Sequence, residues 1–110
     1  QMLLMVLELL VQEHEQNLEQ LKVYARDLEW DKAGSVAHKM ITGFKQLKAD
    51  TVIPHLAILE DALHLPEVDD NALTEAAILT EANALQVLAA LKQEVESIKQ
   101  QTSQTVENTV

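Results

Sequence analysis

The sequence contains no cysteine, only two glycines and two prolines, and 3% aromatic residues. Without cysteine the chain can form no disulfide, no thiolate zinc site and no cysteine nucleophile. The scarcity of glycine and proline, beside an abundance of leucine, alanine, glutamate and glutamine, favours helices over strands. We therefore expect an all-α protein, and the lack of cysteine fits a reducing, cytoplasmic compartment.

Positive charge is also scarce, with 8 Lys and Arg residues against 18 Asp and Glu and a net charge of −10. Nucleic acids and anionic membranes attract proteins through positive charge. The composition therefore predicts no nucleic acid partner and no direct membrane contact, and it favours a protein partner.

A long hydrophobic run is missing as well. The most apolar segment, residues 2–11, is interrupted by Glu8 and has no basic flank, whereas roughly 20 apolar residues are needed to span a bilayer. We expect this segment to be a helix buried on most sides. Because the chain begins with Gln1 rather than methionine, we also expect it to be a piece of a longer protein.

Apolar periodicity and helix-breaking residues predict four helices in one domain. They cover residues 2–28, residues 31–48 with Asp31 as N-cap, a third segment that begins behind Asp50 with Pro54 in its first turn, and a fourth that begins near Asp70. Short connections predict an up-down antiparallel four-helix bundle over residues 1–100, followed by a polar, disordered tail at 101–110. The apolar seam expected on the fourth helix comprises Leu73, Ala77, Ala84, Leu85, Leu88, Leu91, Val95 and Ile98.

The second predicted helix carries an isolated histidine, His38. Its apolar residues form one sector made of Ala33, Val36, Ala37, Met40, Phe44 and Leu47. His38 lies about 140° from the centre of that sector and should face solvent, since each residue turns a helix by about 100°. It is then either an ordinary surface histidine or a reactive one.

The residues one turn away from His38 are unusually small. Of Gly34, Ser35, Ile41 and Thr42, three have small side chains, which would leave the imidazole unobstructed. A glycine within a helix is destabilising relative to alanine, so Gly34 indicates either a close approach or simple tolerance. Gly43 lies beside the apolar sector and is expected to allow close helix packing.

Half of the basic residues fall on this same helix, namely Lys32, Lys39, Lys45 and Lys48. Lys45 follows His38 by two turns on nearly the same line and can lean back toward it. These lysines either attract a phosphoryl group or an acidic surface, or form an ordinary solvated face.

An exposed imidazole can act as a nucleophile, a general base or a metal ligand. Nucleophilic transfer requires the fewest additional groups. None of His14, His55 and His64 stands three or four residues from His38, and no Glu-x-x-His motif occurs, so we expect no metal and no bound cofactor.

The segment "AHKMITGFKQLKADTVIPHLAILEDAL", residues 37–63, resembles the histidine phosphotransfer (HPt) domain of multistep phosphorelays. The usual pattern of that family is Ala-His-x-Leu-Lys-Gly-Ser, then Leu-Gly-Ala, then Leu, Leu and Leu-Glu on the next helix. The positions that match are Ala37, His38, Met40, Leu47, Ala49, Val52, Leu56, Leu59 and Glu60. Three positions depart from it, because the family's lysine is Ile41 here and two of its glycines are Thr42 and Lys48.

The resemblance implies that His38 accepts a phosphoryl group from a receiver-domain aspartyl phosphate and passes it to another receiver aspartate. Mg²⁺ would then belong to the partner receiver domain, Lys45 or Lys39 would replace the missing lysine, and the apolar rim at Ile41 would supply docking surface. The domain would be a monomeric phosphocarrier without kinase activity of its own, at the C-terminal end of a hybrid sensor histidine kinase that is cytoplasmic or tethered to the membrane. The alternative is a non-catalytic interaction or scaffold bundle, including a degenerate HPt domain, in which His38 is incidental.

Overall fold

The computed structural model describes the backbone of residues 2–109 and the side chains of residues 2–101. It contains four α-helices, α1 (Met2–Arg26), α2 (Trp30–Gln46), α3 (Ile53–Asp61) and α4 (Asp70–Thr109), with a short 3₁₀ turn, η1 (Ala62–His64), directly after α3. No strand occurs among the described residues, so the predicted all-α four-helix fold is confirmed. None of the helices, over the described positions, is long and apolar enough to cross a membrane.

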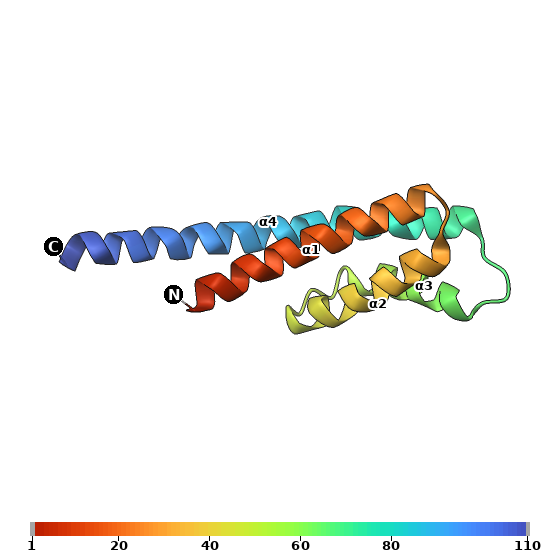
Figure 1. Cartoon of the computed structure of the whole chain (residues 1–110), viewed down its shortest axis with the longest axis horizontal. Coiled ribbons are helices and arrows are strands. Elements are labelled where there is room, and N and C mark those ends of the chain that lie inside the picture. Colours follow the sequence, from red (N-terminus) through yellow and green to blue (C-terminus); the bar gives the residue numbers. More distant parts are fainter. Residues whose placement is uncertain (1, 110) are drawn as a thin grey trace.

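The helices pack in a square in which α1 contacts α2 and α4, and α3 contacts α2 and α4. Consecutive helices run in opposite directions, and α1 and α4 extend together well past the ends of α2 and α3 (Figure 1). The bundle therefore has a four-helix part and a two-helix part. The backbone of α4 runs through residues 101–109, where the sequence predicted a disordered tail at 101–110.

Two helices end earlier than expected because their last turns close through residues in the left-handed region. Leu28 has φ 57° and Lys48 has φ 56°. In each case the next backbone N–H donates to a carbonyl five residues back, from Glu29 to Tyr24 and from Ala49 to Phe44, both at 2.9 Å. This is the Schellman termination, formed here without glycine.

The helix starts agree with the sequence only in part. The predicted N-cap Asp31 is wrong, because α2 begins at Trp30 and Asp31 lies in its first turn. An acidic side chain is favourable there because the first N–H groups carry partial positive charge. Pro54 stands in the first turn of α3, as expected.

The start of α4 near Asp70 is confirmed and is fixed by two side chains. Asp69 Oδ1 accepts hydrogen bonds from the backbone N–H groups of Asn71 (3.0 Å) and Ala72 (3.2 Å), which caps the helix. The indole Nε1 of Trp30 donates to Asp70 Oδ1 at 2.7 Å. The first turns of α2 and α4 are therefore tied together.

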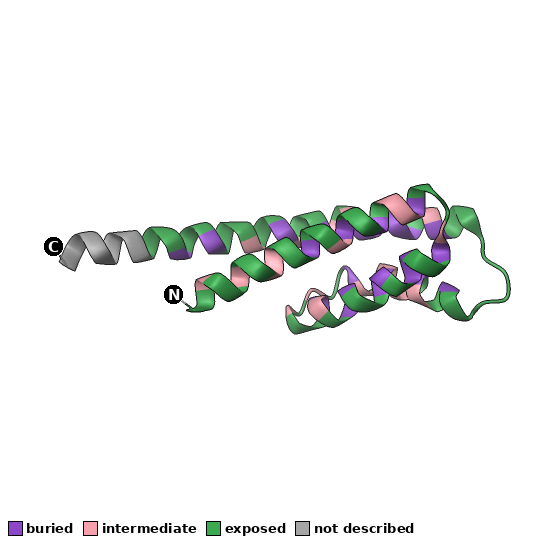
Figure 2. Ribbon diagram, in the orientation of Figure 1, coloured by how far each residue is buried: buried purple, intermediate pink, exposed green. Residues whose placement is uncertain are grey.

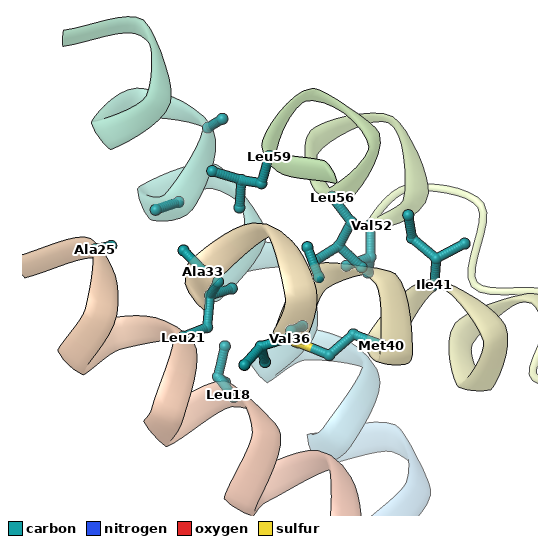
Figure 3. Packing of buried hydrophobic residues seen from close by; sticks show 14 of the residues in the cluster. Leu18, Leu21, Ala25, Ala33, Val36, Met40, Ile41, Val52, Leu56 and Leu59 are labelled. Carbon is teal, nitrogen blue, oxygen red and sulfur yellow. The ribbon is translucent and has the colours of Figure 1, made fainter. Parts of the chain in front are cut away.

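The core is built around α2, whose predicted apolar sector is buried except for the half-buried Leu47. Val36 and Ala33 lie toward Leu18 and Leu21 of α1 (Figure 3). Ile41 is also buried, at 8% exposure, so the docking rim expected there is wrong. The reason is that α3 and the residue before it, Val52, cover that side of α2 (Figure 3).

Two expectations about apolar residues are overturned. The N-terminal segment of α1 is not buried on most sides, since Met2, Met5 and Leu9 are 82%, 63% and 62% exposed. Most of that segment lies in the two-helix part, past the ends of α2 and α3, and only its end approaches α2, where Leu10 and Gly43 line the same cavity (Figure 2). Leu85, placed in the seam of the fourth helix, is 51% exposed and lies outside the core.

Both glycines allow close contacts. A Cβ added at Gly43 would lie 2.5 Å from Cε1 of His14 on α1, so the close packing expected there is confirmed. A Cβ at Gly34 would lie 2.9 Å from the carbonyl oxygen of Leu59 and 2.8 Å from Cγ of Leu63. The close approach indicated by Gly34 is therefore to α3 and η1 of the same chain.

We predict that Gly34→Ala lowers the free energy of unfolding by about 1 to 3 kcal/mol, because the backbone oxygen of Leu59 has to move away from the added methyl group. Urea unfolding followed by circular dichroism measures this. Ser35→Ala is the matched control, since Ser35 is exposed on the same helix and tolerates alanine. Equal stability of the two variants would contradict the contact.

Candidate functional site

His38 lies on the surface of α2 with its side chain 70% exposed, as the helical count predicted. Its Nδ1 atom is 3.3 Å from Oε1 of Glu60, whose side chain is 30% exposed on α3. The two residues come from neighbouring helices, and the contact of Gly34 with Leu59, one turn from His38, holds those helices close at this level. The imidazole is thus positioned from a second helix while remaining open to solvent.

The carboxylate of Glu60 lies on the Nδ1 side of the His38 ring and leaves Nε2 on the open side. A carboxylate beside Nδ1 favours the tautomer that carries its proton on Nδ1. Nε2 then keeps its lone pair. An exposed neutral imidazole in this state is a nucleophile, and the positive charge that develops on the ring during attack is stabilised by Glu60.

Three lysines on or directly after α2 have no acidic partner within the part of the chain whose side chains are described. The ammonium groups of Lys39, Lys45 and Lys48 lie more than 4 Å from every carboxylate among the described side chains. Every other Lys or Arg lies within 4 Å of at least one carboxylate. The basic residues that do have a carboxylate partner are Lys22, Arg26, Lys32, Lys92 and Lys99. In a chain of net charge −10, the unpaired cations among the described side chains therefore lie on, or directly after, the helix that carries His38.

The predicted site residues lie on different sides of α2. Lys45 and Thr42 are exposed and lie within about 40° of His38 around the helix axis, so the three share one face. Lys39 is exposed about 100° away, on the side of α2 that faces α1. Gly34 is buried under η1. His38, Thr42 and Lys45 thus share one face of α2, Lys39 lines a cavity beside α1 together with Thr42, and Gly34 is buried apart from them.

Glu60 is the neighbour that helical counting did not identify. Periodicity shows which side of one helix is exposed, but not which residue of another helix lies beside it. The available signal was the Leu59-Glu60 pair in the segment that resembles HPt domains, since it lies on the helix that follows the histidine.

A second histidine, His14 of α1, is buried at 3% exposure and stacks on Phe44 with ring centroids 4.4 Å apart. Its Nδ1 has no hydrogen-bond partner among the described residues. A cavity of about 220 Å³ adjoins it, lined in part by Glu13, Lys39 and Gly43. Burial lowers the pKa of His14, and the nearby Glu13 carboxylate opposes that shift.

Metal ligation receives no support from the described residues, since they contain no group of three or more His, Cys, Asp or Glu side chains placed to hold an ion. Comparison of the chain with protein-family models, curated proteins and solved structures finds no match. The functional argument therefore rests on the residues and their geometry.

We predict that His14 makes the fold less stable in mild acid. Because its folded-state pKa is below the unfolded value of 6.5, the unfolded chain takes up the proton first, and stability falls as the pH drops below about 6.5 toward the folded pKa. Urea unfolding at pH 7.5 and pH 5.5 measures the loss. In His14→Leu the loss should be smaller, and an equal loss in both proteins would assign it to other groups.

Proposed function

We propose that the protein is an HPt-type phosphocarrier, in which His38 accepts a phosphoryl group from a receiver-domain aspartyl phosphate and donates it to another receiver aspartate. The observation that carries the proposal is the exposed imidazole of His38 with the Glu60 carboxylate at its Nδ1, on a helix that also holds unpaired lysines. We further propose that the domain is a module of a hybrid sensor histidine kinase.

Phosphoryl transfer requires few groups from the phosphocarrier itself. Nε2 of His38 attacks the phosphorus of the acyl phosphate, an N–P bond forms, and the bond from phosphorus to the aspartate oxygen breaks to release a carboxylate. The proton on Nδ1 remains on the ring beside Glu60, and the reverse sequence delivers the phosphoryl group to the next aspartate. Catalysis consists of in-line positioning and charge neutralisation.

The missing groups belong to the partner. A receiver domain supplies the acidic pocket and its Mg²⁺, so the phosphocarrier presents only an accessible nucleophile and a complementary surface. Unpaired lysines suit the acidic rim of such a pocket, because opposite charges speed association and fix orientation. Lys45, on the line of His38, is the lysine that we expect to approach the transferred group.

Two departures from the HPt pattern have a structural interpretation. Lys48 stands where the family has glycine, and its φ of 56° is the backbone conformation for which glycine is usually selected. Ile41 stands where the family has lysine and is buried, so the cation has to come from elsewhere on α2. At the first departure the backbone is one that suits glycine, and at the second we expect Lys45 to supply the cation.

The alternative function is a helical scaffold or degenerate HPt domain in which His38 is an ordinary surface histidine. The pairing with Glu60 favours the carrier, because surface histidines need no carboxylate at Nδ1. Phosphotransfer assays separate the two functions.

We predict that incubation with a phosphorylated receiver domain labels the protein with acid-labile, base-stable phosphohistidine, and that His38→Gln abolishes the label. His64→Gln is the matched control, since His64 is also exposed but lies on η1. Labelling that persists in His38→Gln would eliminate the site, and a wild-type chain that accepts no label from any cognate receiver would favour the scaffold.

We predict that Lys45→Ala slows transfer roughly three- to tenfold, equivalent to about 1 kcal/mol, because it removes a cation near the phosphoryl group. A quenched time course of label transfer at a fixed receiver concentration measures the rate. Lys32→Ala is the control, because Lys32 lies near the opposite end of α2 and is 3.2 Å from Glu29. Equal rates in the two variants would make Lys45 an ordinary surface charge.

A further inference from the structure

The outer face of α4 carries an apolar seam that none of the other described helices covers. Ile78 and Leu85 are 60% and 51% exposed, and Ala82 and Ala89 are exposed as well. These residues are spaced four, three and four apart, the alternation of a coiled-coil seam. The core side of the same helix is already occupied by other residues, among them Ala84 and Leu88. The exposed seam is therefore a second apolar face on α4.

Two grooves follow this seam on the side of α1. One, of about 380 Å³, is lined in part by Ile78 of α4 and Val23 of α1. The other, of about 330 Å³, is lined in part by Leu85 and Ala89. Lys22 of α1 and Glu81 of α4, 3.6 Å apart, line both grooves as well. A helix lying along the seam would pack beside this ion pair, over the apolar edge of each groove.

We propose that this face binds a second copy of the chain, with the two α4 helices packed antiparallel about a twofold axis near residues 83 and 84. In that register Ile78 faces Ala89 of the second copy, and Leu85 faces its Ala82. Each large side chain then meets a small one. Alanine at every seventh position lets the two helices approach closely, and the twofold axis repeats every contact.

The charges at the ends of the seam fit the same register. It places Lys92 opposite Glu75 of the second copy, and Glu75 opposite Lys92 of the second copy. Both residues are exposed. Lys92 already lies 2.8 Å from Glu15 with 58% of its side chain exposed, so its remaining N–H groups are free to bind a second carboxylate. A parallel arrangement would instead place Lys92 beside Lys92 of the second copy and Glu75 beside its Glu75. Such contacts between like charges are unfavourable.

The proposed interface is independent of the His38 site. α4 packs against α1 and α3, and α2 lies across the bundle from it. The seam residues and His38 therefore belong to different faces, so a dimer formed through α4 leaves both His38 side chains accessible. This departs from the monomer expected from the sequence.

Sedimentation equilibrium of the full chain at about 0.15 M salt tests the proposal, since screening at that ionic strength limits repulsion between two acidic copies. The wild-type chain should dimerise in the micromolar range. Leu85→Glu should raise the dissociation constant roughly tenfold or more, whereas Ile58→Glu, which adds the same charge at a residue 46% exposed on α3, should not. A wild-type chain that stays monomeric up to millimolar concentration would overturn the proposal. So would dissociation by Met5→Glu with no effect of Leu85→Glu, which would put the interface on α1.

A charge exchange tests the antiparallel register. Lys92→Glu and Glu75→Lys should each weaken the dimer several-fold, and the double variant should recover wild-type affinity. Within one chain the two positions are about 25 Å apart on α4, since each residue advances a helix by about 1.5 Å. Recovery can therefore arise only between copies. Additive weakening in the double variant would overturn the register.

Discussion

The close contact between α2 and α3 at Gly34 is the constraint on which the candidate site depends. Because residue 34 has no side chain, the backbone oxygen of Leu59 and the side chain of Leu63 pack directly against α2. Glu60 follows Leu59 on α3 and thereby comes within 3.3 Å of the His38 ring. A larger residue at 34 would separate the helices and would also remove the carboxylate from Nδ1. Packing in the interior and chemistry at the surface therefore share one residue.

Helical periodicity predicted the features that belong to one helix at a time. It identified the buried sector of α2, the exposure of His38 and the start of α4. These follow from where apolar residues recur along the chain, because burial of an apolar face is the dominant driving force for helix packing.

The features that periodicity missed all depend on contacts between different helices. Ile41 is buried because α3 covers its side of α2, and Met5 is exposed because α2 and α3 end before reaching it. The clearance assigned to Gly34 is contact with α3, and the partner of His38 comes from that same helix. A single sequence specifies the apolar faces, but the neighbours are determined by the lengths of the helices and their crossing.

The two turns that end α1 and α2 share a backbone form but differ in what they retain. A non-glycine residue in the left-handed region costs about 1 kcal/mol. At Leu28 a glycine would relieve this cost and leave the charge of the surface unchanged. At Lys48 it would remove an unpaired cation from the end of the helix that bears His38. The left-handed conformation at Lys48 thus retains an unpaired cation directly after α2, whereas the same conformation at Leu28 costs stability without retaining a charge.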